Sequence, residues 1–112
     1  MTGELTSEMW VSAHVRKCNL MHMPAFVVNR GDRERGGILV KVNRFGAGCG
    51  LYQPQTDMDG LRFWMPLLDE DADEKKADET IRKRLAFDSD LWVIEIEDQQ
   101  GTHEFDAPVR SF

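Results

Sequence analysis

The sequence predicts an α+β fold for residues 1–112: an N-terminal helix, an antiparallel sheet of four to five strands, a second polar helix and a C-terminal β-hairpin. Several short segments alternate apolar and polar residues, which is typical of strands, and two segments have helical spacing. A chain of 112 residues with 41% apolar residues is long enough for one hydrophobic core. Because no linker or repeat divides the chain, we expect a single compact domain.

The first helix is expected over residues 7–19. Thr6 or Ser7 is a suitable N-cap, and Glu8 lies near the positive end of the helix dipole. One stripe of this helix combines apolar residues with a histidine and a cysteine, and it consists of Val11, His14, Val15 and Cys18. We expect this stripe to face the core.

Four strands are expected before the second helix, over residues 26–29, 38–44, 51–53 and 61–68. The charged, glycine-bounded segment "RGDRERGG" separates the first two strands, so we predict that they form a hairpin. Ile38, Val40 and Val42 alternate on one side of the second strand. In the fourth strand the residues expected to face the same way are Phe63 and Met65.

The second helix is expected over residues 69–86, where acidic residues come first and "RKR" comes last, as the helix dipole favours. A fifth strand follows, with Trp92, Ile94 and Ile96 pointing to the core and Glu95 pointing outward. The turn "DQQG" and the segment "THEF" then complete the predicted C-terminal hairpin.

The formal charge of −6 disfavours contact with nucleic acid and with anionic membranes. No apolar run approaches the roughly 20 residues that span a bilayer, and the first residues do not resemble a secretion signal. Cys18 and Cys49 form no CxxC pair. We therefore expect a cytoplasmic protein with reduced thiols, without nucleic-acid or membrane partners.

The blocks "MWVSAHVRKCN", "GGILVKVNR", "LYQPQ" and "RLAFDSDLWVIEIED" resemble the recurring blocks of an uncharacterised family of short bacterial proteins, a domain of unknown function. The resemblance covers most of the chain and implies a bacterial protein. It assigns no activity, cofactor or catalytic residue.

The spacing of His14, Cys18 and His22 places three potential metal ligands on one side of the first helix. Eight residues of helix separate the two histidines by about 12 Å along the axis, whereas zinc needs ligand atoms at about 2.0 to 2.3 Å. The acidic run "DEDADE" lacks the glycine and the bidentate glutamate of a calcium loop. We therefore expect no metal and no cofactor, and no catalytic residue can be named.

One sheet face is expected to remain exposed, opposite both helices. It would combine tryptophan, arginine and aliphatic residues, a composition that is enriched at interface centres. The interface or ligand candidates are Leu39, Lys41, Arg44, Arg62, Trp64 and Glu95. We expect a non-enzymatic binding or assembly module that forms a homodimer through this face. The alternative is a small enzyme or small-anion-binding protein that uses the basic residues, with Glu95 as acid or base.

Overall fold

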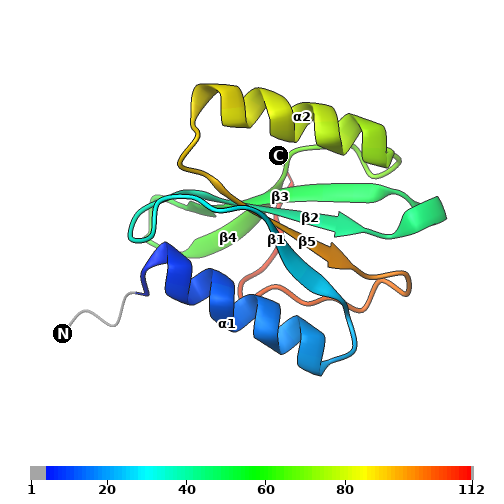
Figure 1. Cartoon of the computed structure of the whole chain (residues 1–112), viewed down its shortest axis with the longest axis horizontal. Coiled ribbons are helices and arrows are strands. Elements are labelled where there is room, and N and C mark those ends of the chain that lie inside the picture. Colours follow the sequence, from blue (N-terminus) through cyan, green and yellow to red (C-terminus); the bar gives the residue numbers. More distant parts are fainter. Residues whose placement is uncertain (1–4, 112) are drawn as a thin grey trace.

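The structure, a computed structural model, describes residues 5–111 and places two helices on opposite faces of a five-stranded sheet (Figure 1). Helix α1 spans Ser7–Leu20 and helix α2 spans Glu74–Phe87. The strands are β1 (Ala25–Asn29), β2 (Ile38–Asn43), β3 (Cys49–Thr56), β4 (Arg62–Pro66) and β5 (Trp92–Glu97). The predicted α+β fold is confirmed.

The sheet has the strand order β1-β5-β2-β3-β4. Three of its neighbouring pairs are antiparallel, but β2 and β5 are parallel, with Ile38 opposite Trp92. The antiparallel expectation is therefore mostly right, and the sheet is mixed. The expected hairpin between residues 26–29 and 38–44 is wrong, because β5 lies between β1 and β2.

The charged segment between β1 and β2 holds the N-terminus of α1. Thr6 caps the helix by accepting a hydrogen bond from the Met9 N–H at 3.2 Å. Glu8 forms ion pairs with Arg30 at 3.1 Å and with Arg33 at 3.3 Å. The segment also accepts hydrogen bonds from the first turn of α1, because the Ser7 N–H donates to the Glu34 carbonyl at 3.1 Å and the Glu8 N–H donates to the Arg33 carbonyl at 2.9 Å. It therefore caps a helix and does not form a hairpin turn.

Helix α2 begins later than expected. Asp73 is its N-cap and accepts a hydrogen bond from the Lys76 N–H at 2.9 Å, so residues 69–72 form an irregular connection from β4. Neither helix in the described part of the chain has the length and apolar character needed to cross a bilayer.

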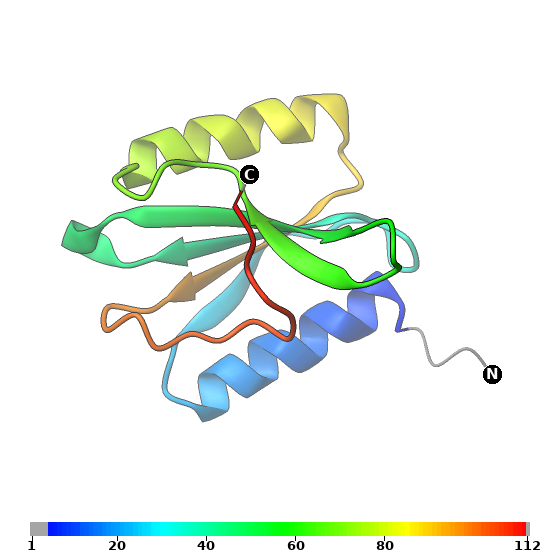
Figure 2. The ribbon, with the colours of Figure 1, turned by 180° about the vertical axis from the view of Figure 1, so that it is seen from behind.

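The segment after β5 is irregular, and the expected C-terminal hairpin does not form. Asp98 turns the chain, because its carboxylate accepts hydrogen bonds from the N–H groups of Thr102 and His103 at 2.9 and 2.8 Å. The chain then passes along α1 and reaches β4 (Figure 2). There the Trp64 N–H donates to the Pro108 carbonyl at 2.8 Å, and the Arg110 N–H donates to the Trp64 carbonyl at 2.9 Å.

Each face of the sheet carries its own hydrophobic cluster. Under α1 and the C-terminal segment the cluster includes Trp10, Val40, Trp64, Trp92, Ile94 and Ile96. Under α2 it consists of Leu39, Leu51, Ile81 and Val93. The inward positions predicted for Trp92, Ile94 and Ile96 are confirmed, since all three are buried.

The expected exposed face is wrong. Trp64 and Leu39 are both fully buried, and they lie on opposite faces of the sheet. The alternation along β4 is as predicted, but its two sides face the opposite way to the prediction, so every side chain of the strand lies on the other face of the sheet. Pro54 opposite Trp64, and Tyr52 opposite Val40, show that Trp64 shares the face of Val40.

Candidate functional site

The first cluster of functional side chains surrounds Lys41 beneath α2. The Lys41 ammonium lies 2.8 Å from Glu74 and from Asp78, and 3.1 Å from Glu95. Its side chain is only 4% exposed. Asn43 donates a further hydrogen bond to Glu74 at 3.2 Å. The expectation that Glu95 points outward into solvent is wrong, because its side chain is 12% exposed and pairs with a buried lysine.

Two opposing effects act on the pKa of Lys41. Burial lowers it, but the hydrogen bonds to Asp78, Glu74 and Glu95 prevail and hold it above its ordinary value. Lys41 is therefore a charged structural residue that joins β2 to α2 and β5. A permanently charged, fully paired ammonium is poorly suited to act as a base or to receive an anion.

A second cluster surrounds Asp106 on the α1 face. Its carboxylate accepts hydrogen bonds from the indole N–H groups of Trp10 at 2.9 Å and Trp64 at 2.8 Å, and Arg62 lies 3.2 Å away. Burial raises the pKa of Asp106, yet the two indole donors hold it below its usual value. The Arg62 guanidinium also lies over the Trp64 ring, 5.3 Å from its centroid.

The structure does not bring the six sequence candidates into one site. Lys41 and Glu95 meet under α2, Arg62 and Trp64 meet on the α1 face, and Leu39 packs in the α2 cluster. Arg44 follows β2, and its side chain lies close to Gly101. The three basic residues therefore have separate partners, and they line no common pocket among the main ones in residues 5–111.

A third cluster was not predicted from the sequence. His14 and Cys18 lie one turn apart on α1, and His103 of the C-terminal segment lies against both. One ligand atom from each residue can be chosen so that all three lie within 4.8 Å of one another. The Cys18 Sγ is 3.8 Å from the His103 Nδ1. His22, by contrast, is exposed after the end of α1 and does not belong to this cluster.

Burial controls the protonation of this third cluster. It lowers the pKa of His14 to about 4 and also lowers the pKa of His103, while it raises the pKa of the Cys18 thiol. Both imidazoles are therefore neutral at pH 7 and present a lone pair. The spacing of His14 and Cys18 indicates two members of the cluster, but nothing in the sequence indicates His103, because 85 residues separate it from Cys18.

Strand β1 forms one edge of the sheet, and it is apolar and exposed. Phe26, Val27 and Val28 are 44%, 38% and 50% exposed. The opposite edge, β4, is covered by the C-terminal segment (Figure 2). The two edges of the sheet therefore differ: one is closed by the chain itself and one is open.

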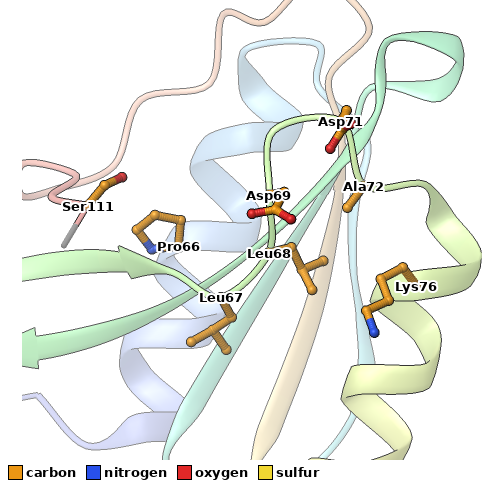
Figure 3. A pocket seen from close by; sticks show the side chains of 8 residues that line it. All are labelled: Pro66, Leu67, Leu68, Asp69, Asp71, Ala72, Lys76 and Ser111. Atoms are coloured by element: carbon orange, nitrogen blue, oxygen red, sulfur yellow. The ribbon is translucent and has the colours of Figure 1, made fainter.

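A pocket between β4 and α2 is lined by Leu68, Asp69, Lys76 and neighbouring residues (Figure 3). Figure 3 shows Lys76 pointing away from Asp69 and Asp71, so charged groups do not converge on a common point. Most of its lining comes from the irregular connection between β4 and α2, and Pro66 of β4, Lys76 of α2 and Ser111 complete it. This pocket offers no arrangement that would orient a substrate.

The fold defines a small α+β domain in which two helices cover opposite faces of a mixed five-stranded sheet. The chain belongs to the family described as "Protein of unknown function (DUF1491)", whose model matches residues 5–106. This confirms the resemblance seen in the sequence. No curated protein matches the chain.

Solved structures of relatives share the fold. A crystal structure of a DUF1491 family protein from Caulobacter crescentus CB15 is 35% identical, covers 96% of this chain and 100% of its own, and has a TM-score of 0.87. An NMR structure of a DUF1491 family protein from the same organism is 36% identical over 95% and 96% of the two chains, with a TM-score of 0.81. The solution structure of protein Atu0922 from A. tumefaciens is 29% identical over 90% and 88%, with a TM-score of 0.72.

Proposed function

We propose that this protein is a non-enzymatic assembly module of the bacterial cytoplasm that pairs with a second copy of itself through the edge strand β1. The observation that carries the proposal is the exposed apolar run Phe26, Val27 and Val28 on an open sheet edge. An exposed apolar edge strand is a template for pairing with another strand. The interface is thus the sheet edge rather than the sheet face that the sequence indicated.

The backbone hydrogen bonds of β1 indicate that the middle of this strand has groups free to pair with another strand. Ala25 points its backbone groups away from β5, where the Asn19 side chain accepts from its N–H and donates to its carbonyl, each at 3.0 Å. In an antiparallel ladder alternate residues point to the same side, so the N–H and carbonyl of Val27 also point away from β5. Asn19 covers the edge at Ala25, and the edge opens to solvent at Val27.

The composition of β1 favours a second copy of this chain as the partner. The strand "AFVVN" has no charged residue, although the chain carries a net charge of −6 that repels another copy elsewhere. An antiparallel pairing of two β1 strands about Val27 is two-fold symmetric, so the same surface serves both chains. It would also bury Phe26 and Val28 of each chain against the other.

Two further observations bear on the compartment and on the class of protein. Cys18 and Cys49 are both buried free thiols on separate elements, α1 and β3, which suits a reducing cytoplasm. The scattered basic residues and the fully paired Lys41 favour a module over the alternative of an enzyme or anion-binding protein.

The experiment is light scattering over a dilution series of tag-free protein. We expect a mass of about twice 12.9 kDa at high concentration, falling toward the monomer on dilution. Phe26→Lys places a charge on the pairing edge and should leave a monomer with an unchanged circular dichroism spectrum. A matched control is Leu61→Lys, which also charges an exposed apolar residue but lies beside the closed edge, and which should remain dimeric.

The dimer proposal would be refuted by a wild-type monomer at every attainable concentration. If the dimer persists equally in Phe26→Lys and Leu61→Lys, the interface does not lie at β1.

A further inference from the structure

We propose that His14, Cys18 and His103 bind one zinc ion between α1 and the C-terminal segment. His14 does not share a metal with His22, since His22 is exposed and lies outside the cluster. His103, which comes from a distant part of the chain, is the third side chain instead.

Two unpaired buried atoms provide the first support. In residues 5–111 the buried side-chain nitrogen or oxygen atoms without a hydrogen-bond partner are the Nε2 atoms of His14 and His103. Buried polar atoms in folded proteins almost always have a partner, because leaving one unpaired is unfavourable. That both unpaired atoms belong to adjacent rings beside a buried thiol indicates a ligand common to all three residues.

The geometry suits a small ion. A tetrahedral zinc site with bonds of about 2.0 Å to nitrogen and 2.3 Å to sulfur separates neighbouring ligand atoms by about 3.3 to 3.6 Å. The Cys18 Sγ and the His103 Nδ1 are 3.8 Å apart, and the full set lies within 4.8 Å. Rotation of the side chains would bring the ligand atoms to zinc-bonding distance. Because Nδ1 of His103 faces the thiol and Nε2 is the unpaired atom, the His103 ring binds through Nδ1 as it stands or through Nε2 after a ring flip.

Aromatic rings pack against both histidines of the cluster. Trp10 stacks on the His14 ring at 4.6 Å between centroids, and Phe105 packs edge-on against the His103 ring at 4.6 Å. Asp98, which is buried, accepts a hydrogen bond from the backbone N–H of His103. Asp98 is thus a positioning residue, because it fixes the turn that brings His103 to α1.

The types of ligand atom in the cluster favour zinc over other common metal ions. Two imidazoles and one thiolate are ligands that zinc prefers, whereas magnesium and calcium prefer oxygen. Cys18 would release its proton to solvent on binding, and a water molecule can occupy the fourth position. The ion would link the C-terminal segment to α1 and so stabilise the position of this segment against β4.

The test uses tag-free protein stripped with a chelator and titrated with Zn²⁺ in competition with a chromophoric chelator. We expect one zinc per chain and a thermal midpoint that zinc raises and chelator lowers again. His103→Gln should weaken zinc binding at least about tenfold. In protein loaded with Co²⁺ instead, wild type should show a thiolate-to-cobalt charge-transfer band, which Cys18→Ser should remove.

Two controls change the same residue types outside the cluster. His22→Gln should bind zinc as wild type does, and Cys49→Ser should retain the cobalt band. If Cys18→Ser fails to fold, His103→Gln decides, because it changes a half-buried side chain on an irregular segment. The proposal is overturned if folded wild-type protein binds no stoichiometric zinc, or if His103→Gln binds zinc as tightly as wild type.

Discussion

Replacing Lys41 by methionine removes the single cation that neutralises three carboxylates under α2. Glu74 and Asp78 are about half exposed and can turn toward water, but Glu95 is 12% exposed and stays where it is. Removing one partner of a buried ion pair typically costs about 3 to 5 kcal/mol. Because two of the three carboxylates can escape, we expect a loss near the lower limit, about 3 kcal/mol.

The assay is urea unfolding followed by circular dichroism, with three companion variants. Glu95→Gln leaves Lys41 two carboxylates and a polar neighbour, so it should cost about 1 kcal/mol. The double variant Lys41→Met with Glu95→Gln should be more stable than the sum of the single losses predicts, since no buried charge remains. Lys75→Met changes an exposed lysine on α2 and should stay within about 0.5 kcal/mol of wild type.

A loss below about 1 kcal/mol for Lys41→Met would refute the view that this cluster is a structural ion pair. Lys41 and Glu95 would then again be candidates for a functional site.

Three further predictions concern the α1 face and the turns, each measured by thermal or urea unfolding. Trp92→Ala should cost about 3 to 5 kcal/mol, because the ring is buried and its indole donates to the Asp32 carbonyl at 2.7 Å. Asp106→Asn should cost about 1 to 3 kcal/mol by leaving an indole donor poorly paired. The pKa of Asp106 in the folded protein lies below the ordinary carboxyl value of 3.8, so its ionised carboxylate stabilises the fold fully above that pH. This stabilisation is lost as the pH falls below 3.8. The stability of Asp106→Asn should therefore decrease less in acid than that of wild type. Gly31→Ala should be strongly destabilising, since a Cβ there would overlap the backbone carbonyl of Asp90, whereas Gly46→Ala, with open space around it, should be nearly neutral.

The elements themselves could be predicted from local sequence, because caps and alternation are local signals. Thr6 and Glu8 placed the start of α1, and Trp92, Ile94 and Ile96 showed the inner side of β5. Strand order is set by pairing between distant segments, and no local signal reports that β5 inserts between β1 and β2. The "RGDRERGG" segment has the composition of a hairpin turn, although it caps a helix.

The sites were harder to predict for the same reason. Alternation shows which residues of one strand share a face, but it does not relate β4 to its neighbours, and so the face of Trp64 was inverted. Lys41 and Glu95 were both noticed, yet their pairing depends on the parallel register of β2 and β5. His103 contacts His14 and Cys18 only because Asp98 turns the chain after β5.

The insertion of β5 between β1 and β2 has a consequence for how the protein is made. A nascent chain that has not yet reached residue 92 contains β1 without a partner strand, and α1 without β5, one of the two strands on which it packs. β2, β3 and β4 can pair as soon as they emerge, since they are consecutive antiparallel neighbours. α1 and β1 must therefore wait for β5, so this part of the sheet is completed only after β5 has been synthesised. Until then both edges of the apolar strand β1 are unpaired, so chaperones that bind exposed apolar segments could bind it.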